Sequence, residues 1–434
     1  MIVATYEDAD ARLLLRLLDT PTVAPLERGE ADPPPQLWEA QRDYAAAAAE
    51  LGFEVVHHGA AVPGDLTGDD VPLSVRRAVD KQPGFLESQP SLVLRLGGRV
   101  GVRDTVMFNV HLDTVAGFEP ASFDGTRFIG RGAIDAKGPT SALLPGIRAA
   151  LATEPALGTE VGVLIQVVSG EEGGAMGTIG TRRLVGEGFV GRLNVFCEPT
   201  RGRYLPRATA SMTASVLVRG EDATDDRPEC GHNATTLLGF LASHLSLALT
   251  ENGAEGTVCI AGLRTGPLHN RVYGSGELLV NMAYDSTPAG HRMGARLEGA
   301  LHEGLQAFSA RFAARATFAR TAADAESVTR LRWLKRGLPV LAASDPWCEA
   351  LLERDVGLER WPDDEPAFTC DAIWMDGVPD TFTVVLGPGD LAANHAHAEG
   401  EFVDLSDLED FAGSVAQTLV SFCRARQNGA GGSG

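Results

Sequence analysis

The sequence lacks the features that mark secreted, disulfide-stabilised and membrane-spanning proteins. Its six cysteines include no Cys-x-x-Cys pair, so neither a disulfide framework nor a thiolate zinc site is indicated. No apolar stretch is long enough to span a bilayer. The chain begins with MIVATYED, which has neither the basic nor the apolar segment of a signal peptide. We therefore expect a cytoplasmic protein with no membrane partner.

Basic residues are also scarce. The chain has 37 lysines and arginines against 58 aspartates and glutamates, which gives a formal net charge of −21. Such a charge repels phosphate backbones and anionic membrane surfaces, so we expect no nucleic-acid partner. Hydrophobic residues make up 44% of the 434 residues, which is sufficient for a large core, and the length suggests two domains.

Apolar periodicity predicts an α/β domain in the first half of the chain. Helical spacing of apolar residues predicts helices over 8–18, 36–51 and 140–151. Strand-like apolar runs lie at 91–96, 105–110, 160–169 and 193–197. Short apolar strands that alternate with helices are typical of a mainly parallel sheet flanked by helices on both faces. We therefore expect catalytic side chains at strand ends.

The pattern changes at residue 210. Strands are expected over 211–219, 257–263, 276–284 and 315–321, with helices over 233–249 and 289–313. This βαββαβ order predicts a smaller α+β domain of ferredoxin-like type. A helix over 346–354, a strand over 382–386 and a helix over 405–425 predict a return to the first domain. The expected division is a catalytic domain of 1–209 and 327–434, interrupted by a domain of 210–326.

A histidine and an aspartate stand two residues apart at the end of an apolar strand. His111 and Asp113 therefore project from the same side of an extended segment. Such a pair suits a metal ligand and its orienting carboxylate, because a carboxylate that accepts the second imidazole N–H fixes the tautomer and raises the basicity of the ligand. On this pattern alone, a structural role for the pair stays open.

Three carboxylates follow in similar settings. Asp135 lies in a glycine-punctuated turn, GRGAIDAKG, which leads into a helix and where a carboxylate could bridge two metal ions. Glu171 and Glu172 directly follow a strongly apolar strand. Burying two adjacent carboxylates is costly without cations, although a solvated acidic turn would have the same sequence.

The remaining candidate ligands come later in the chain. Glu198 ends another apolar strand, and a Gly-Pro-Gly turn precedes His395 and His397, which supply a second histidine. Two imidazoles and three carboxylates suit a divalent ion such as zinc without any thiolate.

The order of these segments resembles a known family. Five motifs are similar to those of the di-zinc metallopeptidase family that includes aminoacylase, succinyl-diaminopimelate desuccinylase, acetylornithine deacetylase and glutamate carboxypeptidase: HxDxV, GRGxxDxKG, SGEEGG, Glu-Pro-Thr and a late GPG followed by His-x-x-x-Glu. The resemblance covers roughly residues 5 to 425. It implies a zinc exopeptidase-like catalytic domain and a smaller lid domain that also mediates dimerisation, so we expect a homodimer.

The resemblance also implies two zinc ions in one site, with cobalt or manganese able to substitute. One ion would be held by His111, Asp135 and Glu198, and the other by Asp135, Glu172 and His397. Glu171 would transfer protons as the general base, while Asp113 would orient His111.

The choice between the two late histidines depends on the glutamate four residues after each. In the family this glutamate is followed by an aromatic and a β-branched residue. Glu401 is followed by Phe and Val, whereas Glu399 is not, which favours His397. The distance from the Gly-Pro-Gly turn favours His395, which is nearer the usual offset.

The inserted domain departs from the family at two places. Thr224 stands where the family has a histidine that helps to hold the tetrahedral oxyanion, and nearby His232 is a candidate replacement. Asn281 and Ala283 stand where the family has Asp-x-Arg, whose arginine clasps the substrate carboxylate.

Two neighbouring residues could compensate for these changes. Asn270 matches a family asparagine and could hydrogen-bond a substrate carbonyl or carboxylate. Arg271 could supply a displaced positive charge, although an ordinary surface position fits it better.

The expected reaction is hydrolysis of an amide bond in an N-acyl amino acid or a small peptide, of deacylase, carboxypeptidase or dipeptidase type. Metal-activated water and Glu171 would supply its chemistry. The altered second domain leaves two alternatives open: amide formation or acyl transfer in a specialised biosynthetic pathway, and a non-catalytic homologue that keeps its metals. The acyl group and the amino acid are not determined by the sequence.

Overall fold

The computed structural model describes residues 2–250 and 256–430. This part of the chain divides into two compact units. The first consists of described residues in Met1–Thr67, Ser74–Ala208 and Leu341–Gly434, and the second of those in Gly68–Leu73 and Thr209–Val340. The boundary expected at residue 326 is wrong, because β14 (Thr329–Lys335) pairs with β9 (Ala210–Arg219) inside the second unit.

A mixed sheet lies at the centre of the first unit. Over the described residues it has six strands in the order β1-β2-β6-β3-β7-β16. Their bounds are β1 (Glu54–Ala60), β2 (Pro90–Leu96), β3 (Thr105–His111), β6 (Gly162–Val168), β7 (Leu193–Phe196) and β16 (Phe382–Val385). Strands β6, β3, β7 and β16 run parallel, whereas β2 and β1 are antiparallel at one edge. The predicted α/β fold with a mainly parallel sheet is confirmed.

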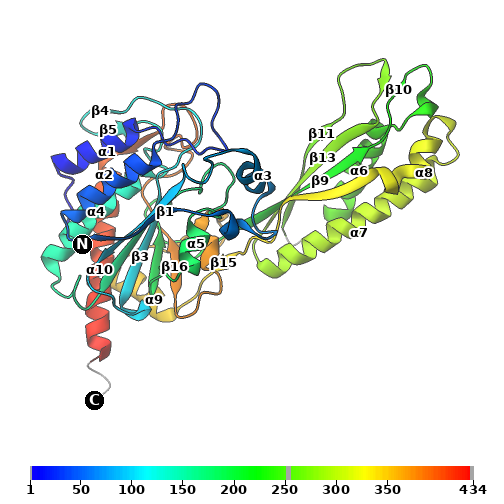
Figure 1. Ribbon diagram of the computed structural model, residues 1–434. Helices are drawn as coiled ribbons and strands as arrows, with labels where there is room; N and C mark the ends of the chain where they lie inside the picture. Colours follow the sequence, from blue (N-terminus) through cyan, green and yellow to red (C-terminus); the bar gives the residue numbers. More distant parts are fainter. Residues whose placement is uncertain (1, 251–255, 431–434) are drawn as a thin grey trace. The chain divides into compact units, whose positions relative to one another are not determined.

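Helices flank this sheet (Figure 1). They are α1 (Asp8–Asp19), α2 (Leu37–Ala49), α3 (Leu73–Lys81), α4 (Lys137–Thr153), α5 (Thr181–Gly186), α9 (Pro346–Ala350) and α10 (Leu405–Ala430). In β3, Val110 packs in the core with α1, α4 and α10, while Asn109 donates a hydrogen bond to Thr181 of α5. Because successive residues of a strand point to opposite faces, α5 covers the face opposite α4.

Helices α4 and α10 cross closely. A Cβ at Gly146 would lie 2.6 Å from the carbonyl oxygen of Ala412, so a larger residue would force the helices apart. The crossing therefore depends on glycine, and it links the first and last parts of the discontinuous unit.

Shorter elements complete the first unit. They are η1 (Pro63–Leu66), η2 (Val102–Asp104), β4 (Ser122–Phe123), β5 (Arg127–Ile129), β8 (Arg207–Ala208), β15 (Leu341–Ala342), the π-helical η5 (Leu351–Val356), η6 (Asp371–Met375) and β17 (Phe402–Asp404). Strand β17 pairs with β5, and β5 pairs with β4. This pairing holds the segment after His397 against the turn that contains Asp135.

The second unit contains an antiparallel sheet. Among its described residues the sheet has four strands in the order β11-β13-β9-β14, and α6 and α7 pack against it (Figure 1). The elements are β9, β10 (Ala223–Thr224), η3 (Pro228–Cys230), α6 (Ala234–Thr250), β11 (Thr257–Arg264), β12 (Arg271–Val272), β13 (Ser275–Tyr284), α7 (Thr287–Phe312), η4 (Ala316–Phe318), α8 (Ala319–Val328) and β14. The strand expected over 315–321 is wrong. That segment forms η4 and the start of α8, and β14 is the last strand of the βαββαβ pattern.

Across the described residues, no helix combines the length and the apolar character that crossing a membrane requires.

Candidate metal centre

Three neighbouring strands bring candidate ligands to one edge of the central sheet. His111 is the last residue of β3, Glu171 and Glu172 follow β6, and Glu198 lies two residues beyond β7. These strands are adjacent and parallel, so their carboxyl ends meet at the same edge. Residues that are far apart in the sequence therefore lie close together.

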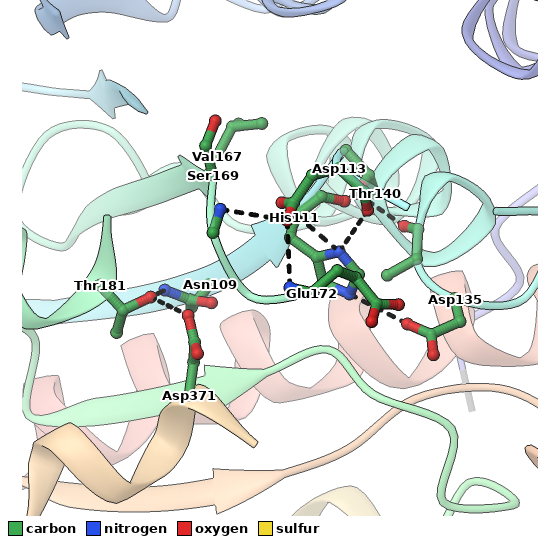
Figure 2. Close-up of polar contacts among 12 residues, drawn as sticks. Asn109, His111, Asp113, Asp135, Thr140, Val167, Ser169, Glu172, Thr181 and Asp371 are labelled. Atoms are coloured by element: carbon green, nitrogen blue, oxygen red, sulfur yellow. Dashed lines mark hydrogen bonds and ion pairs between the residues drawn. The ribbon is translucent and has the colours of Figure 1, made fainter. Parts of the chain in front are cut away.

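Asp135 lies between the two histidines of this cluster, as Figure 2 shows for His111. Its Oδ1 is 3.0 Å from His111 Nε2, and its Oδ2 is 3.1 Å from His397 Nε2. His111 Nε2 is also 3.6 Å from Glu198 Oε1, and His397 Nε2 is 3.0 Å from Glu172 Oε1. The candidate ligand atoms form two groups that share Asp135, and within each group they lie within 4.8 Å of one another.

The local chain places Asp135 at the start of α4. Gly132 has a left-handed φ of 89°, and a Cβ there would lie 2.9 Å from Lys137 Cδ. Glycine is therefore required in this turn. The backbone N–H of Lys137 donates to the carbonyl of Gly132 and closes the turn at 2.8 Å.

The donor set fits divalent cations. Asp135, Glu172 and Glu198 are 7%, 7% and 8% exposed. Burial, together with the charge of Asp135, raises the pKa of Glu198 well above its ordinary value and also raises the pKa of Glu172. These shifts arise because several carboxylates are buried close to one another, where their negative charges repel and water cannot screen them. Imidazole and carboxylate donors in this number are the ligands that divalent ions such as zinc use.

The two histidines already compensate part of this negative charge. Burial lowers the pKa of His111, but the hydrogen bond to Asp135 and the charge of Glu198 outweigh burial and raise the pKa well above its ordinary value. Hydrogen bonds to Asp135 and Glu172 raise the pKa of His397 to about 10. Burial acts against ionisation of Asp135, yet the hydrogen bonds from both histidines lower its pKa. The carboxylates around both imidazoles therefore favour positive charge at this position, which is also what bound cations would supply.

Glu171 lies beside the cluster and has a raised pKa. Burial raises its pKa well above the ordinary value, His111 opposes this shift, and the charges of Asp371 and Glu198 add to it. Its side chain is partly accessible, unlike that of Glu172. A raised pKa favours the protonated form of this carboxyl group.

The sequence predicted that the carboxylate of Asp113 orients His111, but the backbone carbonyl of Asp113 does so instead. His111 Nδ1 is 2.9 Å from the backbone carbonyl oxygen of Asp113, whereas the carboxylate oxygen Oδ1 is 3.9 Å away. The other oxygen, Oδ2, accepts from the backbone N–H groups of Gly170 at 3.1 Å and Glu172 at 3.0 Å (Figure 2). Buried backbone donors require an acceptor, so the carboxylate holds the turn and the carbonyl orients the imidazole.

Glu401 holds the loop of Asp135 in place. Its Oε1 accepts from the backbone N–H groups of Ile134 and Asp135, each at 3.1 Å, and its Oε2 is 2.8 Å from Arg131 Nη1. The side chain is 1% exposed. In the sequence, Glu401 served only to identify the preceding histidine, and its spacing gave no sign of this supporting role.

Of the two late histidines, His397 lies in the cluster and His395 does not. The exposed ring of His395 packs edge-on against Phe402, with 5.7 Å between ring centroids. Both histidines have a left-handed backbone conformation, with φ of 58° and 62°. The irregular loop therefore determines that the side chain of His397 faces Asp135, in agreement with the histidine that the Glu-Phe-Val motif favoured and against the offset from the Gly-Pro-Gly turn.

A buried aspartate that sequence reasoning missed lies beside the cluster. Asp371 is 1% exposed and accepts a hydrogen bond from the Thr181 hydroxyl (Figure 2). Asn109 of β3 donates to Thr181 at 3.2 Å and to Gln166 at 2.8 Å, so Asp371 connects to the strand that ends at His111. Burial raises the pKa of Asp371 to about 7. Asp371 lies in a segment without helical or strand periodicity, which is why no sequence signal marked it.

The candidate substrate residues lie in the second unit. Thr224 of β10 pairs with Arg271 of β12. Asn270 is the residue directly before Arg271. Arg271 forms an ion pair with Asp222 and lies over the ring of Tyr273 at 5.8 Å. These contacts bind Arg271 within its own unit.

His232 also has partners within the second unit. It is 4% exposed, its Nδ1 accepts from the backbone N–H of Glu221 at 2.9 Å, and its Nε2 is 3.1 Å from Asp324 Oδ2. Both ring nitrogens are therefore engaged in holding the β9–β10 connection.

An α/β sheet that gathers two imidazoles and three carboxylates at its carboxyl edge, with an α+β unit inserted in the chain, defines a class of metallohydrolase. A family model described as peptidase family M20/M25/M40 matches residues 107–421. The chain therefore belongs to peptidase family M20/M25/M40, whose members are metallohydrolases that act on peptide or amide bonds. The suspected family is confirmed.

Individual relatives agree with this family. A protein of Aeropyrum pernix described as a LysW-lysine/LysW-ornithine hydrolase is 34% identical over 176 residues, which are 40% of this chain and 46% of the relative. The match thus spans about half the length of that relative.

Solved structures match over nearly the whole chain. A tripeptidase from Staphylococcus aureus is similar with a TM-score of 0.69 at 14% identity, covering 98% of this chain and 100% of that chain. An M20 family metallo-carboxypeptidase from Sulfolobus solfataricus has a TM-score of 0.67 at 13% identity, covering 96% and 100%. At these identities the matches establish the fold.

Proposed function

We propose that this chain is a hydrolase that cleaves an amide bond in an N-acyl amino acid or a small peptide and uses two zinc ions. Family membership supports the reaction class. The observation that carries the metal assignment is the carboxylate of Asp135, whose two oxygens each lie close to a different histidine. A carboxylate in that position is suited to bridging two cations.

In this proposal, His111, Asp135 and Glu198 hold one ion, and Asp135, Glu172 and His397 hold the other. When bound, two divalent ions would polarise an amide carbonyl and make water nucleophilic near neutral pH. Cobalt or manganese would substitute for zinc, because the oxygen and nitrogen donors accept all three metals.

Glu171 performs the proton transfers. It takes a proton from the water whose oxygen forms the new bond to the carbonyl carbon. It then delivers that proton to the amine nitrogen as the C–N bond breaks, so a carboxylic acid and an amine are the products. Asp113 assists by holding the backbone of the turn that carries Glu171 and Glu172.

One relative supports a narrower substrate class within this proposal. The name of the Aeropyrum pernix relative supports an amide of lysine, ornithine or a similar amino acid. Thr224, Asn270 and Arg271 remain proposed substrate contacts, and the second unit remains the proposed lid and dimerisation domain.

The test measures bound metal and turnover together. Purified protein is assayed on N-acyl amino acids and dipeptides, then stripped with a chelator and reloaded with zinc, cobalt or manganese. We expect activity to disappear with the metal and to return on reloading. Asp135→Ala should lose more metal than His111→Ala, because Asp135 serves both ions, and His395→Ala should lose none. Full turnover after verified metal removal, or equal metal loss in all three variants, contradicts the proposal.

A further inference from the structure

The loop that carries His397, residues 390–402, has an irregular backbone. His395, His397 and Gly400 have left-handed φ angles of 58°, 62° and 76°. This conformation is uncommon and costly for residues other than glycine, so contacts with the surrounding structure must hold the two histidines in it. The base of the loop is closed by Asn394, whose Nδ2 donates to the Phe402 carbonyl at 3.1 Å. The N–H of Phe402 donates to the Asn394 carbonyl, also at 3.1 Å. We call residues 390–402 the His397 loop.

Glu119 fastens the tip of the His397 loop to another part of the chain. The backbone N–H of Gly400 donates to both oxygens of its carboxylate, Oε1 at 3.0 Å and Oε2 at 3.1 Å. Among the hydrogen bonds and ion pairs of the described chain, those that join residues 395–400 to segments outside the loop involve either Glu119 or His397 itself. Without Glu119, the position of the tip would therefore depend on the side chain of His397.

Glu119 is itself held in place. Its Oε1 lies 3.9 Å from Arg131 Nη2, and its side chain is 21% exposed. Arg131 Nε donates to the carbonyl of Gly117 at 3.1 Å, and the N–H of Gly117 donates to Asp32 Oδ1 at 3.2 Å. The backbone two residues before Glu119 is thus fixed at both its N–H and its carbonyl. An acceptor that is fixed in this way can hold Gly400 at one position.

These contacts connect the two segments that bring ligands to one of the candidate metal groups. Gly400 lies three residues after His397. Arg131, the partner of Glu119, lies four residues before Asp135. Glu119 therefore fixes the distance between the loop of His397 and the turn of Asp135, whose side chains must both face the same ion.

We propose that Glu119 is a positioning residue for the ion assigned to Asp135, Glu172 and His397, which we call the second ion. It acts through Gly400 and does not contact the ion. A loop that is ordered before binding loses less conformational entropy when the ion binds, so the affinity is higher. The other candidate group takes no residue from the His397 loop, so the first ion should keep its affinity. This inference rests on the proposed metal assignment.

The test compares Glu119→Ala with Glu399→Ala, which removes the same charge from an exposed position of the His397 loop. Metal-free protein is titrated with zinc in competition with a chelator of known affinity, and the variant His397→Ala identifies the binding step of the second ion. We expect Glu119→Ala to weaken the second ion by about 10–100-fold and to leave the first unchanged, because this is the usual effect of removing a group that supports a ligand. Glu399→Ala should leave both ions unchanged.

A conservative variant separates the hydrogen bond from the charge. Glu119→Gln keeps an oxygen that can accept from Gly400, so it should bind the second ion more tightly than Glu119→Ala. Equal affinities in these two variants would contradict a role through Gly400. Melting curves of the metal-free proteins show whether the variants are folded. If Glu119→Ala is not, Glu119→Asp replaces it, because its side chain keeps the charge but is one methylene shorter, and it should weaken the second ion alone.

The remaining outcomes distinguish this inference from the metal assignment on which it rests. A wild-type chain that binds two ions, with unchanged affinity for the second in Glu119→Ala, overturns the role of Glu119 and leaves the metal assignment intact. Equal weakening of both ions also overturns it, since a general loss of structure would act on both. A wild-type chain that binds one ion overturns the metal assignment and this inference together.

Discussion

Two adjacent glutamates have different environments at the residue scale. Glu172 points toward His397, with 3.0 Å between Oε1 and Nε2, and its backbone N–H is held by Asp113. Glu171 belongs to neither group of candidate ligands and is partly accessible. Both residues lie in the bend and turn after β6, and this turn directs the carboxylate of Glu172 among the candidate ligands and that of Glu171 beside them.

The first prediction separates these two carboxylates. Glu171→Gln should keep both metals and substrate binding but lower kcat by about 10²–10⁴-fold, because the amide keeps the size of the side chain and cannot accept the proton. Glu172→Gln should lose metal and melt at a lower temperature when metal is limiting. Bound metal, melting temperature and turnover are measured for both. Metal loss in Glu171→Gln with full metal in Glu172→Gln would reverse the two roles.

The second prediction concerns His397 in metal-free protein. Its pKa is raised from 6.5 to about 10 by Asp135 and Glu172, so its protonated form stabilises the fold. That stabilisation is complete below about 6.5 and is lost as pH rises through about 10. The melting temperature of chelator-treated protein should therefore fall more between pH 7 and pH 10 than that of His397→Ala. The matched variant His395→Ala should follow the wild-type curve, and identical curves for all three proteins would exclude the effect.

At the scale of elements, the candidate centre depends on two supported loops. The turn after β6 is held by the carboxylate of Asp113, and the turn before α4 by the carboxylate of Glu401. Glu401 is brought there by the pairing of β17 with β5, which joins the late part of the chain to the early part. The positions of the candidate ligands therefore depend on these two loops, and the loop of Asp135 depends on the pairing of β17 with β5.

The third prediction tests the support from Glu401. Its ion pair with Arg131 is buried, with side chains 1% and 6% exposed. Glu401→Ala should lower the free energy of unfolding by about 3–5 kcal/mol, because it leaves a buried guanidinium without its partner. It should also weaken metal binding through the freed loop of Asp135. Glu399 is exposed in the same segment, so Glu399→Ala should change neither property. Denaturant unfolding and bound metal are the measurements, and equal stability of the two variants would contradict this role.

At the scale of the whole molecule, the chain forms a first unit from three separate segments and a second unit largely from one insertion. The insertion keeps the ferredoxin-like strand order but has altered residues at positions where the family contacts substrate. Asn281 and Ala283 lie on the same face as the cations of β14. Both departures from the pattern that the motifs resemble, at Thr224 and at Asn281 and Ala283, therefore lie in the second unit.

The fourth prediction is a C2 homodimer through the second unit. Strand β11 is an edge of the sheet, and Leu263 on it is 40% exposed. An exposed edge with an apolar side chain is suited to pairing with a second copy. Light scattering should give a dimer mass, and Leu263→Lys should shift it toward monomer. Leu247→Lys changes a more exposed leucine of α6 and should leave the mass unchanged. A monomer mass for the wild-type chain at all working concentrations would reject the dimer.

Part of the fold was predictable because local pattern and burial coincide. The fully buried run of β3 contains four apolar residues and ends in a histidine, so both the strand and its terminal histidine were visible in the sequence. The strand predicted over 315–321 was wrong for the opposite reason. The alanines and phenylalanine of this segment are compatible with helix and strand alike, and the segment forms η4 and the start of α8. The burial of Asp371 also had no local signal, because its partners come from α5 and the sheet.

The sequence by itself predicted the α/β class and the inserted α+β unit, because the periodicity of apolar residues encodes which faces are buried. Its motifs, through their resemblance to the family, named the candidate metal-binding side chains. Only the tertiary structure decided how these side chains meet. It placed Asp135 between two histidines, and it showed that a backbone carbonyl, not the Asp113 carboxylate, is the hydrogen-bond partner of His111 Nδ1. His397, which the motif after it already favoured, is the late histidine that lies in the cluster. These outcomes depend on the order of strands in the sheet and on left-handed loop conformations, which residue spacing does not encode.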